Sequence, residues 1–348
     1  MQSADSSLQS APQARDGFPQ LEMTICAVVL GLLLASTVHA QTLPAESGAQ
    51  IRRTVELVNV DVAVTDARGR FRRDLTERHF RILDNAVPQP ITHFASVEAP
   101  AIVLVLVETS PAVYLLHRQH LMAAHALLDG LAADDQVALA TYDATARVVM
   151  GFTSDKNRLR GAMNSLTYGL GVSALNLYDG VSTAVDWLAA VPGKKAIVLL
   201  STGLDPAPAA RWEALSDKLA ANDVSIFAVG LGGDLREFRE QMETSASGTP
   251  LSFERASETL RQMAGSTGGR AFFPKSAKEV PEMYRELALT LRHRYSLAFT
   301  PPARDGARHE IIVEVLDDRG NVVGASPAPQ QRQRYRVYAR RGYIAPAR

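Results

Sequence analysis

A carboxylate stands at the end of an otherwise apolar strand. Residues 102–107 read Ile-Val-Leu-Val-Leu-Val, and Glu108 follows them directly. A buried carboxylate costs free energy unless it is paired, so this glutamate needs a partner. Ser110 stands before Pro111, as in a helix N-cap followed by proline in the first turn, and needs no special chemistry. Glu108 is therefore the residue here that calls for a functional explanation.

The sequence lacks the usual signatures of an enzyme site. Gly230-Leu-Gly-Gly233 follows a predicted strand but does not have the Gly-x-Gly-x-x-Gly spacing of a dinucleotide site, and no Gly-x-Ser-x-Gly elbow occurs. His117, His120 and His125 do not form the His-Glu-x-x-His spacing of a zinc site. We therefore predict a non-enzymatic protein. The alternative is an exported hydrolase that pairs Ser173 with a histidine.

Apolar strands alternate with helical segments from residue 101 onward. The predicted buried strands are 102–107, 136–141, 196–200, 224–230 and 269–273. Apolar residues recur at helical spacing in 113–131, 177–188 and 280–291. Apolar strands joined by helices predict an α/β fold with a doubly wound, mainly parallel sheet covered by helices on both faces. Such a sheet binds ligands at the carboxyl ends of its strands, where Glu108 lies.

The segments on either side of this region have the period-two alternation of half-buried strands. The strands predicted there are 54–65, 80–83, 91–94, 295–300, 310–315 and 335–338. We expect an N-terminal β segment at 41–98 to pair with a C-terminal β segment at 295–345. Together they would form a small accessory β domain beside an α/β domain at 99–294.

The N-terminus has the features of an export signal. An apolar run at 23–36 is followed by Val38-His-Ala40, which fits the small-residue cleavage rule. The run is short for a membrane span. We expect residues 1–40 to be removed as a signal peptide together with Cys26, the only cysteine, leaving a periplasmic or secreted chain without a transmembrane span. The alternative is an N-terminal anchor that stays uncleaved.

The charge balance gives no reason to expect nucleic acid as a partner. The 348 residues carry 37 basic and 37 acidic side chains, so no global field attracts a polyanion. Near the C-terminus, arginines interleave with tyrosines, namely Arg332, Arg334, Arg336, Arg340, Arg341 and Arg348 with Tyr335, Tyr338 and Tyr343. Such a strand can stack bases. A solvated strand face, or contact with an acidic partner surface, suits a neutral exported protein better.

Several strings occur in an order that is informative as a set. They are Val-Thr-Asp-Ala-Arg-Gly at 64–69, Asp-Leu-Thr at 74–76, Phe-Arg-Ile-Leu-Asp-Asn at 80–85, Lys-Lys-Ala-Ile-Val-Leu-Leu-Ser-Thr-Gly-Leu-Asp at 194–205, Gly-Gly-Arg-Ala-Phe-Phe-Pro at 268–274 and Arg-Gly-Tyr at 341–343. In this order they resemble a von Willebrand factor type A domain protein, of the secreted "VWFA-related" group common in acidobacterial proteins. The resemblance spans roughly residues 54–345.

The resemblance implies a divalent metal site, which this chain carries in altered form. Type A domains hold Mg²⁺ or a similar hard cation through three loops, with Asp-x-Ser-x-Ser in the first loop. Here Glu108 stands in place of the aspartate, Ser110 is kept, and Ala112 supplies no oxygen. The second loop offers Ser173, with a spacing that departs from the family pattern.

The third loop of the family carries an aspartate that this chain replaces with Thr202, and Asp205 lies three residues further on. We expect the ligand-facing rim to contain Glu108, Ser110, Ser173, Thr202 and Asp205. We predict metal-free recognition of a protein or cell-surface ligand. The alternative is a Mg²⁺-dependent adhesion domain, in which Glu108, Ser110 and Ser173 bind the cation and Asp205 moves inward.

Overall fold

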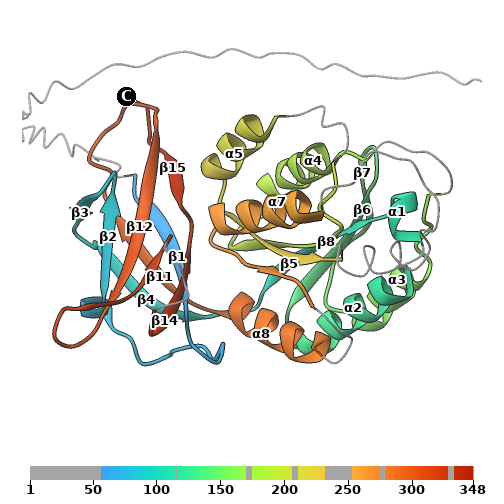
Figure 1. The fold of residues 1–348 in the computed structure, drawn as a ribbon, viewed down its shortest axis with the longest axis horizontal. Coiled ribbons are helices and arrows are strands. Elements are labelled where there is room, and N and C mark those ends of the chain that lie inside the picture. The colour runs from blue at the N-terminus through green and yellow to red at the C-terminus, as the bar shows by residue number, and fades with distance from the viewer. Residues whose placement is uncertain are drawn as a thin grey trace, which may run out of the picture. The chain divides into compact units, whose positions relative to one another are not determined.

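The computed structural model describes residues 56–114, 117–169, 175–205, 211–231, 253–274, 279–327 and 333–347. All of them belong to the unit Thr54–Arg348, which contains an α/β region and a β sandwich (Figure 1). Within these described ranges, no helix has the length and apolar character needed to cross a membrane.

A six-stranded sheet forms the centre of the α/β region, in the order β10-β9-β8-β5-β6-β7. Its strands are β5 (Ile102–Glu108), β6 (Gln136–Tyr142), β7 (Ala146–Thr153), β8 (Lys195–Ser201), β9 (Val224–Gly230) and β10 (Ala271–Phe272). Neighbouring strands are parallel except for β6 and β7. The inner strands are continuous runs of buried apolar residues, because helices cover both faces of the sheet.

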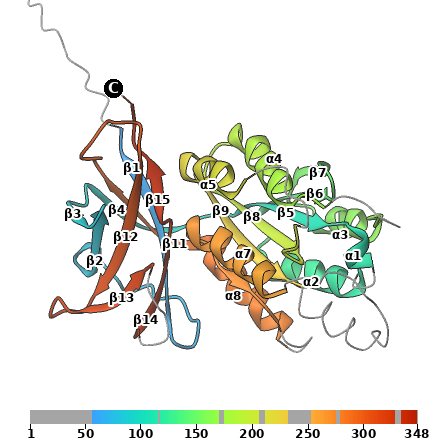
Figure 2. The same cartoon turned by 45° about the horizontal axis from the view of Figure 1, so that its top comes forward.

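Helices flank this sheet and confirm the predicted α/β fold. They are α1 (Pro111–Tyr114), α2 (His117–Gly130), α3 (Lys156–Asn164), α4 (Leu177–Ala189), α5 (Trp212–Ala221), α7 (Phe253–Ser266) and α8 (Val280–Arg292). Helices α4 and α5 lie on one side of the sheet and α2 and α8 on the other (Figure 1, Figure 2). The predicted apolar face of α4 is fully buried, at Leu177, Val181, Val185 and Leu188.

Two antiparallel sheets and a short 3-10 helix, η1 (Glu77–His79), make up the β sandwich. One sheet has the order β14-β1-β11-β4, with β14 (Tyr335–Ala339), β1 (Val58–Asp66), β11 (His293–Phe299) and β4 (His93–Glu98). The other has the order β13-β12-β2-β3, with β13 (Val322–Ser326), β12 (Arg308–Leu316), β2 (Phe80–Asp84) and β3 (Val87–Gln89), and β15 (Gly342–Ile344) also pairs with β12. Strand β1 pairs with both β11 and β14. One strand from before the α/β region and two strands from after it therefore lie in the same sheet.

Several elements differ from the predictions made from sequence. The edge strand β7 was not predicted, because Val148 and Val149 are exposed and the strand lacks a buried alternation. The helix predicted at 113–131 corresponds to α1 and α2, and residues 115–116 between them lie outside the described residues. Strand β4 begins at His93, two residues later than predicted, and β10 is only two residues long. Helices α3, α5 and α7 and strands β3, β13 and β15 were also missed.

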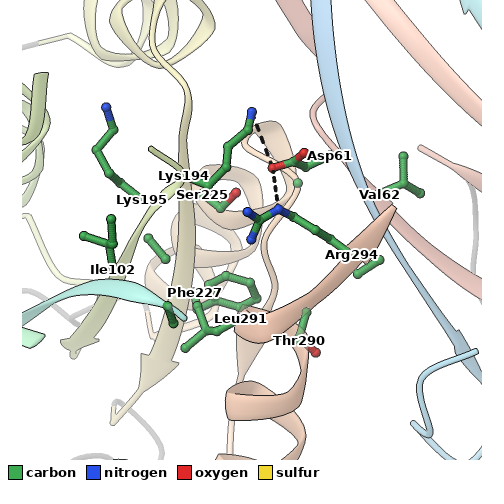
Figure 3. A pocket seen from close by; sticks show the side chains of 14 residues that line it. Asp61, Val62, Ile102, Lys194, Lys195, Ser225, Phe227, Thr290, Leu291 and Arg294 are labelled. Atoms are coloured by element: carbon green, nitrogen blue, oxygen red, sulfur yellow. Dashed lines mark ion pairs between the residues drawn. The ribbon is translucent and has the colours of Figure 1, made fainter. Parts of the chain in front are cut away.

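A charged cluster joins the sandwich to the amino-terminal end of the parallel strands (Figure 3). The Asp61 carboxylate on β1 lies 3.5 Å from Lys194 Nζ and 3.3 Å from Arg294 Nε. These groups line a pocket of about 50 Å³. Burial raises the pKa of Asp61, and the neighbouring charges of Lys194 and Arg294 do not fully offset this rise. The junction between the two regions is therefore polar.

Candidate functional site

Glu108 lies at the topological switch point of the sheet, where the strand order reverses. It is the last residue of β5, whose neighbours are β6 on one side and β8 on the other. The chain adds β6 and β7 on the first side and then returns to add β8, β9 and β10 on the second. Open α/β sheets bind ligands at such a switch point, outside the carboxyl ends of the strands. The fold therefore places Glu108 at the expected ligand edge.

Ser110, Ser201 and Thr202 together supply four donor groups to the Glu108 carboxylate, which is completely buried. The Ser110 hydroxyl donates to Oε1 at 2.7 Å, and the Ser201 hydroxyl donates to Oε2 at 3.1 Å. Thr202 donates through its backbone N–H to Oε2 at 2.7 Å and through its hydroxyl to both oxygens, at 3.1 and 2.9 Å. A carboxylate offers about four lone-pair positions, so these donors saturate it.

Tyr142 extends this hydrogen-bond cluster. Its hydroxyl lies 2.7 Å from Ser201 Oγ and 3.2 Å from Glu108 Oε2. The ring packs against α4 at Gly180, where an added Cβ would lie 2.9 Å from a ring carbon. Gly203 N–H donates to Ser201 Oγ at 2.8 Å, which fixes the loop after β8. The cluster thus ties together the ends of β5, β6 and β8.

Burial dominates the titration of this cluster. It raises the pKa of Glu108, although the hydrogen bonds from Ser110, Thr202 and Ser201 act in the opposite direction. Burial, followed by the nearby Glu108 charge, raises the pKa of the Tyr142 phenol well above its usual value, so this phenol stays protonated. Tyr142 therefore acts as a hydrogen-bond donor at neutral pH.

Asp205, on the loop after β8, lies beside the N-terminus of α4 in space. Its Oδ2 accepts the backbone N–H of Tyr178 at 3.2 Å, which meets one of the unpaired donors of the helix N-terminus. Burial raises the pKa of Asp205, and the charge of Asp179 raises it further. Asp205 Oδ1 and Asp179 Oδ2 are buried, and neither has a hydrogen-bond partner among the described residues. Within the described part of the chain, two carboxyl oxygens beside the switch point are thus left unsatisfied.

The structure brings together three of the five predicted rim residues. Ser110 and Thr202 both contact Glu108, and all three side chains are buried. Asp205 follows on the same loop as Thr202 but faces the N-terminus of α4. Ser173 lies outside the described residues, so the hydrolase alternative that depends on it stays a prediction.

Sequence reasoning missed Tyr142, Ser201 and Asp179. Tyr142 and Ser201 are the last residues of β6 and β8, as Glu108 is of β5. A polar residue at the end of an apolar strand is the signal that would have found them. Asp179 is the acidic residue in the first turn of α4, a common helix feature that carries no signal of its own.

The residues around Glu108 do not fit a hard divalent cation. Such an ion needs several oxygen ligands with free lone pairs. The Glu108 carboxylate is saturated by hydrogen bonds, and Ala112 has no side-chain oxygen. Within the described part of the chain, no group of three or more histidine, cysteine, aspartate or glutamate residues is placed to hold a metal ion.

Two histidines in the sandwich, His309 and His293, contact polar side chains. His309 Nδ1 lies 2.7 Å from Asp84 Oδ1, and His293 Nε2 lies 2.7 Å from a guanidinium nitrogen of Arg73. Of His117 and His120, only the helical backbone is described. His125 is on α2, and its Nε2 is buried without a hydrogen-bond partner.

The chain thus has a mainly parallel α/β sheet with a buried polar cluster at its switch point. A family model for the von Willebrand factor type A domain matches residues 118–286. The chain therefore carries a von Willebrand factor type A domain. The match begins after Glu108 and Ser110, so the altered first loop lies outside the matched residues. No curated protein matches the chain.

Several solved structures resemble the chain. They include the conserved hypothetical protein BatB from Bacteroides thetaiotaomicron, with 12% identity over 55% of this chain and 98% of that one and a TM-score of 0.42. A von Willebrand factor type A protein from Catenulispora acidiphila has 12% identity over 68% of this chain and 72% of that one, with a TM-score of 0.41. Proximal thread matrix protein 1 from the mussel byssus, with a zinc occupied MIDAS motif, has 18% identity over 60% of this chain and 49% of that one, with a TM-score of 0.42.

Proposed function

We propose that this protein is a non-enzymatic recognition protein that binds a protein or surface ligand through its type A domain without a metal ion. The observation that carries this proposal is the environment of Glu108. Its carboxylate binds the hydroxyls of Ser110 and Thr202, the first-loop and third-loop positions that hold the cation in the family. A side chain of this protein thus takes over the role of joining the two loops.

Exposed groups around this edge would contact the ligand, while the buried cluster holds the loops in place. Tyr114 on α1 is 45% exposed, and Tyr178 and Trp212 are half-buried with ring centroids 6.1 Å apart. Tyrosine and tryptophan are enriched among the residues that dominate binding energy at protein interfaces. Glu108, Ser110, Ser173, Thr202 and Asp205 would then shape the rim, and the aromatic side chains would supply contact area.

Thermal unfolding of residues 41–348 tests the absence of a metal role. The melting temperature is measured in EDTA and then in millimolar Mg²⁺, Mn²⁺ or Ca²⁺. We expect the same value in every condition, because a ligand stabilises only the state that binds it. A rise with one cation that disappears in Glu108→Ala would overturn the metal-free proposal.

One observation favours the metal-dependent alternative. Asp205 Oδ1 and Asp179 Oδ2 are buried without partners from the residues that the structure describes, and carboxylate oxygens are suitable ligands for Mg²⁺. On this alternative, a cation would bind beside α4 rather than at Glu108. A cation-dependent rise in melting temperature that is lost in Asp205→Asn but kept in Glu108→Gln would identify that site.

We also propose that the protein acts outside the cytoplasm, as the secreted group that it resembles does. The support is the apolar run at 23–36 followed by Val38-His-Ala40, which lies outside the described residues. Expression of the full chain in a bacterial host, followed by mass spectrometry of the periplasmic fraction, should yield a product that begins at Gln41. Recovery of only uncleaved chain from the membrane fraction would favour the anchor alternative.

A further inference from the structure

We propose that the protein has a second binding site, an arginine-lined pocket that takes an oxyanion group such as a carboxylate or a phosphate. The pocket has a volume of about 290 Å³, and Arg261, Arg270 and Arg341 are among the residues that line it. It is separate from the Glu108 cluster. Gly269, also in its lining, precedes β10, whereas Glu108 ends β5, and the strands of this part of the sheet are parallel. The two sites therefore lie at opposite edges of the sheet.

Arg341 is the residue that points most directly to a ligand. It is exposed and, among the residues that the structure describes, its guanidinium has neither an ion pair nor a hydrogen bond. The guanidinium lies against α7. A Cβ built at Gly265 would lie 2.8 Å from Arg341 Nη2 and 3.1 Å from Cζ, so a side chain at this position would require the guanidinium to shift. An arginine without an acceptor beside a pocket is available to bind an anion.

Aromatic rings hold the other two guanidinium groups. Arg270 lies over the ring of Phe272 at 4.6 Å and near that of Tyr338 at 5.7 Å, and it also pairs with Glu286. Arg261 lies over Phe273 at 4.5 Å. When a guanidinium group stacks on an aromatic ring, its N–H donors lie in a plane parallel to that ring. A ligand can therefore approach them from the side. The pocket thus presents donors from α7, from the residue before β10 and from the link between β14 and β15.

The charge around the pocket favours an anion. Among the described residues that line it, there is no aspartate or glutamate. Glu286 partly neutralises Arg270, and Glu258 pairs with Arg261 at 3.4 Å across an exposed surface, where such a pair is weak. Arg341 adds a charge that no described acidic residue pairs with. Because guanidinium groups match carboxylate and phosphate oxygens in geometry, these two groups are the ligand chemistry that the pocket would select.

Calorimetric titration tests this proposal, with inorganic phosphate and succinate as probes at constant ionic strength. The wild-type protein should bind at least one of them saturably, with a Kd of about 1 mM or tighter. Arg341→Gln should weaken that binding at least tenfold, because it removes a charge-assisted contact. Gly265→Ala should also weaken it, because the new methyl group displaces the Arg341 guanidinium.

Arg334→Gln provides the matched control. Arg334 is also exposed and directly precedes β14, which Arg341 follows, but it lies over the ring of Tyr335 and outside the pocket lining. Its replacement should leave binding within twofold of wild type. Phosphate binding alone would assign the pocket to phosphorylated ligands, and succinate binding alone to carboxylates. The proposal fails if neither probe binds, if Arg341→Gln binds like wild type, or if Arg334→Gln weakens binding equally.

Discussion

Glu108 is one methylene group longer than the aspartate that the resemblance leads us to expect at this position. The carboxylate reaches both the N–H and the hydroxyl of Thr202 on the loop after the neighbouring strand. By the same resemblance, we expect a second carboxylate in the family where this chain has Thr202. The two changes suit each other, because a carboxylate and a hydroxyl attract where two carboxylates would repel without a cation between them.

Removal of this carboxylate should destabilise the fold. Glu108→Ala leaves the Thr202 N–H and the hydroxyls around it without their buried acceptor, at a cost of about 2–3 kcal/mol in free energy of unfolding. Urea unfolding at pH 5 measures the change. The control is Glu77→Ala, at an exposed position in η1, which should stay within about 0.5 kcal/mol of wild type. Equal stability of the two variants would show that the cluster does not hold the loops.

Restoration of the family's carboxylates should create a metal site. In Glu108→Asp/Thr202→Asp, a shorter carboxylate replaces that of Glu108 and a second carboxylate replaces the Thr202 hydroxyl. Both face the Ser110 hydroxyl, and the two loops are no longer joined unless a cation binds between them. The double variant should be less stable than wild type in EDTA. Mg²⁺ at ten times its Kd should then stabilise it by about 1.4 kcal/mol, with no effect on wild type. A double variant that ignores Mg²⁺, Mn²⁺ and Ca²⁺ alike would contradict this account of the exchange.

The sequence was sufficient to predict that Glu108 needs a partner, but not which partner it has. A buried carboxylate after six apolar residues is visible in the sequence. Its neighbours Tyr142 and Ser201 lie 34 and 93 residues away and meet it only because β6 and β8 flank β5. Strand order is set by packing of the whole sheet, so no local pattern reveals these contacts.

Among the elements of the sandwich, β2, β12 and β15 share a buried polar contact. Asp84 on β2 accepts a hydrogen bond from the Tyr343 hydroxyl of β15 at 2.8 Å and lies 2.7 Å from His309 Nδ1 of β12. Burial alone would lower the pKa of His309, but hydrogen bonds to Asp84 and Asp305 outweigh it and raise the pKa above 6.5. Protonated His309 thus strengthens the pairing of these strands.

The sandwich should accordingly lose stability as the pH rises. A histidine whose pKa is raised by folding contributes stability that is fully present below its unfolded pKa of 6.5 and is lost as the pH passes the higher folded value. Free energies of unfolding from pH 5.5 to 8.5 should therefore fall more steeply for wild type than for His309→Gln. His93→Gln, on the exposed edge strand β4, should follow wild type. Parallel curves for wild type and His309→Gln would exclude this role.

Element types were predictable where an apolar pattern is long and buried. Strands β5, β6, β8 and β9 are continuous apolar runs, and each was predicted within about one residue. Strand β7 escaped because an edge strand needs no buried face, and its Val148 and Val149 are exposed. Short β3 and β15 pair for only three residues and leave too brief a pattern to detect.

At the scale of the whole molecule, the chain starts the sandwich, builds the α/β region and then completes the sandwich. The two cores are distinct sets of buried residues. Polar contacts join them, among them the pairs of Asp61 with Lys194 and Arg294 and that of Arg308 with Asp217 at 3.1 Å. Cooperation between the cores therefore depends on a small number of hydrogen bonds and ion pairs.

Arg340 offers a direct test of whether these polar contacts couple the two cores. From the sandwich it donates to the carbonyl of Ala220, the second-to-last residue of α5, and to that of Gly342 at 2.9 Å. Burial lowers the pKa of its guanidinium, although the charges of Asp223 and Asp61 partly restore it. Arg340→Ala removes both bonds and should cost about 2–4 kcal/mol.

Differential scanning calorimetry should then show one transition for wild type and two for Arg340→Ala, because the weakened junction no longer couples the two cores. The control is Arg336→Ala, which changes a half-buried arginine on β14, the strand that precedes Arg340. Among the described residues, Arg336 has no side-chain bond to the α/β region. It should melt as wild type does. If Arg340→Ala and Arg336→Ala gave the same single transition, the two cores would be coupled by packing rather than by the polar contacts at their junction.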